Sequence, residues 1–341
     1  MGTQKHARSG NVVVLRRNAA AAAPFARVRG GALPAREPWA DPDRPPDWDE
    51  PLDESASLGI GRSTTFPLPQ WRAHDLYRTV YFDEGRGRTV VFVHGLGANA
   101  THWELIAPKL AGRMRVAGLD LVGCGWSRKP DMDYRVETLR DHLLDFMERR
   151  RIRSATLVGH SLGGAVVTAA ALAAPGMVES LALFCPAALG PLPLPLRLAA
   201  RTLLYRDVAF PFLRHGADFI LSNVFVDGAQ QNRYVSWFHT MSLRDDPGFP
   251  HLRDFARVGT SLCRDVIGLD YSDSLTALGV PVLVILGDHD RLSSLSGVLG
   301  RLDGARRVRT VVIRRCGHMP MVERPDETLF HLERFLERPP L

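Results

Sequence analysis

A serine flanked by glycines is the residue best placed to act as a nucleophile in this chain. Ser161 lies within residues 158–164 (VGHSLGG), which follow an apolar run and precede an alanine-rich stretch. In a Gly-x-Ser-x-Gly sequence the glycines leave room for a sharp strand-to-helix turn that exposes the hydroxyl at the positive end of the helix. We therefore predict that Ser161 is a catalytic nucleophile. The alternative is a glycine turn that contains a serine by chance.

A serine hydroxyl is weakly nucleophilic at neutral pH unless an imidazole accepts its proton. His318 is the best candidate among the 12 histidines, because it directly follows the last apolar run, on a loop expected at the same sheet edge as Ser161. His160 is adjacent to Ser161 but is expected to point elsewhere on the turn. An orienting carboxylate is available from Asp288 or Asp290, after the preceding apolar run. The order serine, aspartate, histidine is the one expected for this geometry.

The elements that must position these residues follow an alternating pattern from about residue 72. Short, mostly continuous apolar runs predict buried parallel strands. Amphipathic stretches between them predict helices, one including Val136–Met147 with Arg149–Arg151 at its C-terminal end and another over Glu327–Arg338. This pattern predicts an α/β fold. The strand candidates are Thr79–Phe82, Thr89–Val93, Arg115–Leu119, Ala155–Val158, Leu181–Phe184, Val282–Leu286 and Val308–Ile313.

An insertion interrupts this alternation at residues 187–253. Several prolines open it, and a segment rich in Leu, Phe and Tyr follows. A compact α/β unit needs only one helix at this point, so the excess predicts a helical cap. Its aromatic pair Trp237 and Phe238 is a candidate for substrate binding, although such pairs also occur in cores.

Composition limits the possible partners. The 341 residues are 45% apolar and 23% charged, and no run approaches the roughly 20 apolar residues that span a bilayer, which excludes stable membrane insertion. The net charge is +6, but we find no basic stripe interleaved with aromatics, so no nucleic-acid partner is predicted. The four cysteines show no paired spacing, which favours reduced thiols and no metal site.

The first 60 residues differ from the rest of the chain. Residues 1–36 hold seven basic and no acidic residues, and residues 37–54 hold eight acidic residues, one Arg and several prolines. With few large apolar side chains to offset the entropy of ordering, residues 1–60 are predicted to be a disordered or extended tail. We expect a cytoplasmic protein; export or organelle import directed by this tail is the alternative.

From about residue 70 onward the chain resembles the α/β-hydrolase superfamily. Four motifs carry the resemblance, and they occur in the same order as in that family: residues 92–97 (FVHGLG), residues 120–127 (DLVGCGWS), the turn at Ser161, and Gly317-His318 followed by Glu323 and Pro325. The resemblance implies an α/β-hydrolase fold, with a mostly parallel sheet flanked by helices. The core would comprise residues 61–186 and 254–341, and residues 187–253 would form the helical cap.

The resemblance also implies roles for individual residues. Similar proteins place the acid at Gly-x-x-Asp, which favours Asp290 over Asp288. The backbone amides of Leu96 and Leu162 would form the oxyanion hole. His94 and Asp120 would hold the oxyanion loop and a turn rather than act as acid or base. No cofactor and no metal are implied.

These residues predict a serine hydrolase that cleaves a carboxylic ester or thioester of a largely apolar small molecule through an acyl-enzyme on Ser161. Haloalkane dehalogenases and most epoxide hydrolases carry Asp where this chain has Ser161, so those activities are disfavoured. The alternatives are a carbon–carbon hydrolase of ring-cleavage products, a cofactor-free perhydrolase and a non-catalytic hydrolase-fold receptor. Carbon–carbon hydrolases usually carry Gly-Pro-Gly where this chain has Gly95-Leu96-Gly97. The oligomeric state is left open.

Overall fold

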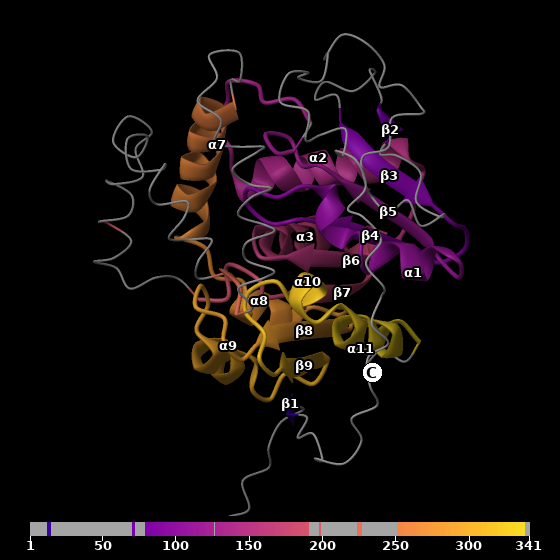
Figure 1. The fold of residues 1–341 in the computed structure, drawn as a ribbon, viewed down its shortest axis with the longest axis vertical. Coiled ribbons are helices and arrows are strands. Elements are labelled where there is room, and N and C mark those ends of the chain that lie inside the picture. The colour runs from indigo at the N-terminus through magenta and orange to yellow at the C-terminus, as the bar shows by residue number, and fades with distance from the viewer. Residues whose placement is uncertain are drawn as a thin grey trace, which may run out of the picture.

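A computed structural model describes residues 79–125, 127–190, 198, 224–226 and 251–337, together with two short strand segments at 12–14 and 70–71 (Figure 1). Its centre is a sheet with the strand order β1-β9-β8-β7-β6-β4-β5-β3-β2. Neighbouring strands are parallel except where β3 pairs with β5 and β2 pairs with β3. The strands are β1 (Val12–Val14), β2 (Gln70–Trp71), β3 (Val80–Glu84), β4 (Thr89–Val93), β5 (Arg115–Leu119), β6 (Ala155–His160), β7 (Val178–Phe184), β8 (Val282–Gly287) and β9 (Val308–Ile313).

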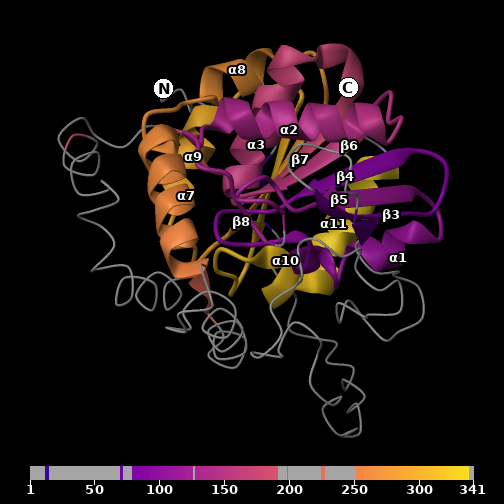
Figure 2. The same ribbon diagram turned by 90° about the horizontal axis from the view of Figure 1, so that it is seen from above.

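Helices cover both faces of this sheet. Figure 2 shows α2, α3 and α8 on one face, and α1, α10 and α11 on the other. Within the part of the chain that the structure describes, no helix is long and apolar enough to span a membrane. The α-helices of the described residues are α1 (Ala107–Ala111), α2 (Val136–Arg149), α3 (Leu162–Ala173), α7 (His251–Val266), α8 (Ser272–Ala277), α9 (Leu295–Leu302), α10 (Pro320–Glu323) and α11 (Pro325–Glu337). The same residues include the 3₁₀ turns η2 (Ala100–Trp103) and η3 (Pro175–Met177).

Alternation along the strands explains the two layers of helices. Successive side chains of a strand point to opposite faces of the sheet. In β4, Val91 and Val93 pack into the core under α2 and α3. Val90 and Phe92 pack into the opposite core, which includes α1 and α11. Because both faces are covered, these strands are continuously apolar, as the sequence predicted.

The helix α7 crosses the predicted boundary at residue 254. It begins at His251, and its residues Val258 and Leu262 are buried in the same core as α2. It also caps α2, because the Asp265 carboxylate accepts a hydrogen bond from the N–H of Val136 at 2.8 Å. A carboxylate at a helix N-terminus satisfies a free N–H group and interacts favourably with the helix dipole.

The structure describes only small parts of the two segments that the sequence set apart. Val12–Val14 forms β1 and pairs in parallel with Thr310–Val312 of β9. The remainder of the predicted tail, residues 1–60, lies outside the described residues. In the predicted cap, Leu198 and residues 224–226 are described, together with part of α7.

Asp83, Arg115 and Arg150 form an ion cluster at the antiparallel side of the sheet. The side chain of Asp83, in β3, is 4% exposed. It accepts two hydrogen bonds from Arg115, at 2.8 and 2.7 Å, and one from Arg150 at 2.7 Å. Burial raises the pKa of Asp83, but these hydrogen bonds outweigh it, so the pKa falls below its ordinary value. The guanidinium of Arg150 also lies 4.9 Å from the ring centroid of Tyr81.

Asp83→Asn should therefore lower the free energy of unfolding by about 3 kcal/mol, because it leaves two partly buried guanidinium groups without their counter-charge. Urea unfolding at pH 7 measures the loss. Asp141→Asn is the matched control: it removes an exposed partner of Arg140, and we expect a change of less than about 1 kcal/mol. Equal losses in the two variants would contradict the importance of the cluster.

Candidate active site

Ser161 lies at a strained turn between β6 and α3. Its φ of 51° and ψ of −117° place a non-glycine residue at positive φ. The backbone around it is held on both sides: the Ser161 N–H donates to Phe184 O at 3.0 Å, and the Ser161 carbonyl accepts from the N–H groups of Gly164 and Ala187, each at 2.9 Å. The structure thus has the strand–turn–helix arrangement that the sequence predicted around Ser161.

The glycines near Ser161 are required by close backbone approaches. A Cβ on Gly159 would lie 2.5 Å from the carbonyl oxygen of Gly163, and a Cβ on Gly163 would lie 2.3 Å from that of Val93. A Cβ on Gly95, in the loop after β4, would lie 3.1 Å from the Cβ of Ser161. The glycines therefore allow the turn itself, and they bring the loop after β4 against the serine.

Gly159→Ala should abolish most hydrolysis and destabilise the protein by more than about 2 kcal/mol, because backbone atoms must move to accept the methyl group. Thermal unfolding and rates with a p-nitrophenyl ester measure the two effects. Gly300→Ala in α9 is the control, since a Cβ there meets nothing within 4 Å. Alanine is favoured over glycine inside a helix by about 1 kcal/mol, so this variant should be as stable as the parent or more so.

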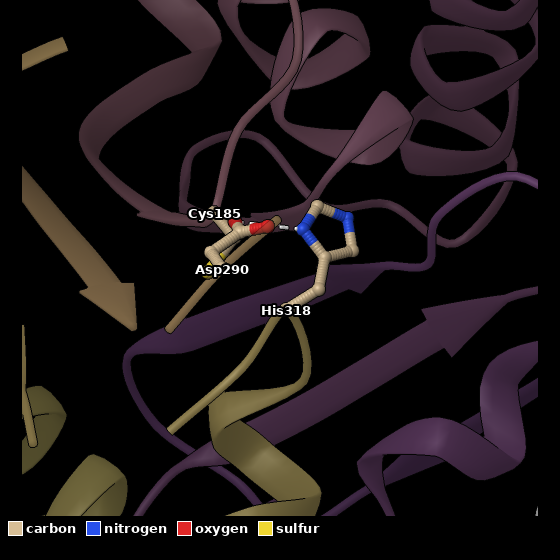
Figure 3. A group of neighbouring side chains, drawn as sticks. All are labelled: Cys185, Asp290 and His318. Carbon is tan, nitrogen blue, oxygen red and sulfur yellow. Dashed lines mark hydrogen bonds and ion pairs between the residues drawn. The ribbon is translucent and has the colours of Figure 1, made fainter. Parts of the chain in front are cut away.

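The predicted catalytic residues follow the C-terminal ends of three parallel strands and lie at one edge of the sheet. Ser161 follows β6, Asp290 follows β8 and His318 follows β9, and these strands lie near one another in the sheet order. His318 Nδ1 lies 2.9 Å from Asp290 Oδ2, and both side chains are buried, at 8% and 1% exposure (Figure 3). The predicted histidine and aspartate are therefore paired.

The surroundings of Asp290 keep its carboxylate charged. Burial raises its pKa, but hydrogen bonds from His318, from the Ser293 hydroxyl at 2.6 Å and from the Leu292 N–H at 2.8 Å lower the pKa to about 2. An ionised carboxylate only accepts hydrogen bonds, so His318 Nδ1 carries the proton. His318 Nε2 is then the nitrogen that can accept a proton from a nucleophile.

Asp288, the alternative acid, is engaged elsewhere. Its Oδ1 lies 2.6 Å from Nδ1 of His289 and accepts a hydrogen bond from the Cys316 N–H at 3.2 Å. Of the two aspartates, only Asp290 is hydrogen-bonded to His318 among the interactions of the described residues. The geometry thus favours the choice of Asp290.

His160 joins the serine turn to the histidine loop, a contact that the sequence did not predict. It is the last residue of β6, and its Nε2 lies 2.8 Å from the carbonyl oxygen of His318. Since a carbonyl only accepts, Nε2 is the donor. The centroids of the His160 and His318 rings lie 4.9 Å apart. Burial lowers the pKa of His160 well below its ordinary value, so the His160 ring is neutral. No hydrogen bond between Ser161 Oγ and His318 is formed among the described residues.

His94 holds the candidate oxyanion loop. Its Nε2 accepts from the Leu121 N–H at 3.0 Å, so its Nδ1 donates to the Gly95 carbonyl at 2.8 Å. Burial lowers the pKa of His94 to about 4, which keeps the ring neutral. Asp120 accepts a hydrogen bond from the Ala100 N–H at 2.7 Å, in the 3₁₀ turn that follows the loop. Both contacts fit the structural roles predicted for these residues.

The two predicted oxyanion donors belong to segments next to Ser161. Leu162 begins α3, and N–H groups in the first turn of a helix have no acceptor within the helix. Leu96 follows Gly95, whose position against Ser161 brings the loop close to the nucleophile. The oxyanion roles of Leu96 and Leu162 remain predictions. Trp237 and Phe238, the predicted substrate-binding pair, lie outside the described residues.

Cys185 completes the surroundings of the aspartate–histidine pair. It directly follows β7 with a φ of 42°, and its sulfur, a carboxylate oxygen of Asp290 and a ring nitrogen of His318 lie within 4.8 Å of one another (Figure 3). This donor set is one that zinc uses, but a thiol must lose its proton to bind a metal. Burial raises the pKa of the Cys185 thiol well above its ordinary value, so a neutral thiol packed beside Asp290 is favoured.

Comparison with known proteins places this site in a family. A family model described as the alpha/beta hydrolase fold matches residues 88–325, which is more than half of the chain. The chain belongs to the α/β-hydrolase family, and both the fold and the family predicted from its motifs are confirmed. It is a hydrolase.

Individual relatives cover the chain to different extents. An uncharacterized protein of Mycobacterium tuberculosis (strain ATCC 25618 / H37Rv) is 37% identical over 122 residues, and the match spans only 36% of each protein. The 2-hydroxymuconate semialdehyde hydrolase of Pseudomonas sp. (strain CF600) is 30% identical over 253 residues, which cover 72% of this chain and 86% of that enzyme. The crystal structure of a membrane phospholipase A, a bacterial virulence factor, has a TM-score of 0.56 and 27% identity, and the match covers 80% of this chain and 86% of that one.

Proposed function

We propose that the protein is a serine hydrolase that cleaves a carboxylic ester or thioester through an acyl-enzyme on Ser161. The observation that carries the proposal is the buried His318–Asp290 pair, which lies on loops at the same sheet edge as the strained turn of Ser161. His160 adds a direct link between the serine turn and the His318 loop. The structural likeness to a membrane phospholipase A agrees with this class of reaction.

In each half of the proposed reaction, His318 first accepts a proton and then donates it. His318 Nε2 accepts the proton of Ser161 as its Oγ attacks the ester carbonyl, and the backbone N–H groups of Leu96 and Leu162 stabilise the oxyanion. The imidazolium, stabilised by the ionised Asp290, then donates its proton to the departing alcohol or thiol. In the second half, His318 Nε2 removes a proton from water as its oxygen attacks the acyl carbonyl, and the imidazolium then returns this proton to Ser161 Oγ as the acyl–oxygen bond breaks and the acid leaves.

The acyl group is proposed to be largely apolar, because the inserted segment 187–253 is rich in large apolar side chains. Burial contributes about 0.8 kcal/mol per methylene, so each added CH₂ should raise kcat/KM by about threefold to fourfold until the binding site is full. Initial rates with p-nitrophenyl esters from acetate to octanoate give this profile. A flat profile in the unmodified protein would contradict the apolar pocket.

Carbon–carbon bond hydrolysis is the second candidate, favoured by the similarity to 2-hydroxymuconate semialdehyde hydrolase. The oxyanion loop argues against it, since this chain has Leu96 where carbon–carbon hydrolases usually have proline. Loss of the visible absorbance of a dienoate ring-cleavage product measures that activity. We expect kcat/KM for this compound to lie at least about tenfold below that for the best ester; the reverse order would favour the second candidate.

A cytoplasmic location is also proposed. The four cysteines, Cys124, Cys185, Cys263 and Cys316, are free thiols, as is usual in reducing compartments. Mass measurement of the protein from its native cell tests the proposal. Removal of about 30 N-terminal residues would instead indicate export or import.

A further inference from the structure

Glu323 accepts hydrogen bonds from the backbone N–H groups of the two residues that flank His318. The side chain is at the end of α10, and the residue is 5% exposed. Its Oε1 accepts a hydrogen bond from the Gly317 N–H at 2.9 Å and a longer one from the Met319 N–H at 3.4 Å. A Cβ on Gly317 would lie 2.4 Å from the carbonyl oxygen of Val224 and 2.9 Å from this carboxylate oxygen, so the backbone approach requires glycine. One carboxylate oxygen thus holds the backbone before and after His318.

The second oxygen of Glu323 binds the inserted region. Oε2 accepts a hydrogen bond from the Val226 N–H at 2.8 Å. The backbone of the histidine itself makes a parallel contact, since the His318 N–H donates to Val224 O at 2.8 Å. Val224 and Phe225 are buried in the core beneath the loop. Residues 224–226 are therefore joined to the His318 loop by two hydrogen bonds, one of which is made by the Glu323 side chain.

A carboxylate suits this position better than an amide does. All three groups that face Glu323 in these hydrogen bonds are backbone donors, and an ionised carboxylate offers two oxygens that only accept. Burial keeps the pKa of Glu323 above its ordinary value, although the three N–H groups and the nearby Arg324 oppose that rise. A glutamine would place an NH₂ donor against a backbone N–H on one side, and one of the two links would be lost.

We propose that Glu323 is a positioning residue that fixes His318 relative to Ser161. Through the same carboxylate, the position of His318 depends on the position of residues 224–226 of the inserted region. The inference deepens the proposed function, because it rests on His318 as the general base. If Glu323 is altered, the loop shifts while the Ser161 turn and the Asp290 carboxylate remain in place. A misplacement of about 1 Å at a reacting group can lower a rate by about 10²-fold.

The first test compares Glu323→Gln with Asp326→Asn in the purified full chain. Asp326 is an exposed acid in the first turn of α11, paired with Lys109, and therefore a matched acid-to-amide control. Rates with p-nitrophenyl butyrate are divided by the concentration of sites that a fluorophosphonate can label at saturation. For Glu323→Gln we expect a 10- to 100-fold lower kcat with KM within threefold, and for Asp326→Asn a change within twofold. An unchanged kcat per site, whatever the melting temperature, would overturn the proposal.

Glu323→Asp is the second variant, in case the glutamine protein does not fold. It keeps the charge but shortens the side chain by one methylene, so the carboxylate cannot reach Gly317 and Val226 together. The same fall in kcat is expected. Full activity of Glu323→Asp would overturn the bridging role.

A substrate-independent measurement separates this inference from the proposed function. In protein labelled with ¹⁵N-histidine, the Nδ1 proton of His318 bonded to Asp290 should give a far-downfield resonance, assigned by its loss in His318→Ala. We expect Glu323→Gln to shift or broaden this resonance and Asp326→Asn to leave it unchanged. Such a shift in a protein that hydrolyses no ester would support the positioning role and refute the proposed reaction. An unchanged resonance in an active esterase would refute only the positioning role.

Discussion

Ser161→Ala and His318→Ala should each lower kcat for ester hydrolysis by about 10³- to 10⁶-fold, and the double variant should lose little more. The two residues act in one proton transfer, so once either is absent the other has nothing to contribute. Steady-state rates for the three variants measure the effect. Circular dichroism should show the parent fold for each variant. His318→Ala removes the partner of the buried Asp290 carboxylate and leaves it the Ser293 hydroxyl and the Leu292 N–H as donors, so urea unfolding should show a lower stability for this variant than for Ser161→Ala.

Two outcomes would contradict this expectation. Multiplicative losses in the double variant would show that Ser161 and His318 act independently. A Ser161→Ala protein with near-parental kcat would show that the nucleophile is another residue or that water attacks directly.

Asp290→Asn should lower kcat by up to about 10⁴-fold, because the amide NH₂ facing His318 Nδ1 favours the tautomer with its proton on Nε2. That tautomer cannot accept the serine proton. Asp288→Asn is the matched control, with the same change of chemistry two residues away, and its effect should be far smaller, since Asp288 contacts His289 and the Cys316 N–H. The pH–rate profiles of both variants should be compared at saturating substrate. A larger loss for Asp288→Asn would reverse the assignment of the acid.

The parts of the fold that repeat a local pattern could be predicted from sequence. Thr89–Val93, Arg115–Leu119 and Val308–Ile313 form strands with the bounds expected from their apolar runs. Burial on both faces makes such strands continuously apolar, and that signal lies within the strand itself. The position of His318 and of the loop holding Asp288 and Asp290 at one sheet edge could likewise be predicted, because the C-terminal ends of neighbouring parallel strands lie together; the choice of Asp290 came from the family resemblance.

Contacts between distant segments left no such local signal. The sequence shows Glu323 only as part of a motif. Its hydrogen bond from the Val226 N–H, 97 positions earlier, follows from packing rather than from spacing. The sequence shows His160 only as a neighbour of Ser161 in the turn, and its hydrogen bond to the carbonyl of His318, 158 positions away, leaves no local signal. Cys185 is beside Asp290 because β7 and β8 are neighbours in the sheet. Such contacts depend on strand order, which a single sequence does not specify.

The most direct test of the central claim is covalent labelling of the native protein with a fluorophosphonate, followed by peptide mapping. Attack of Ser161 Oγ on phosphorus expels fluoride and transfers the serine proton to His318, so labelling requires the same activated nucleophile as ester hydrolysis. We predict one adduct, on the peptide that contains Ser161, with protection by an ester substrate and loss of the adduct in Ser161→Ala. An adduct on another residue, or ester turnover that persists in Ser161→Ala without any adduct, would contradict the account.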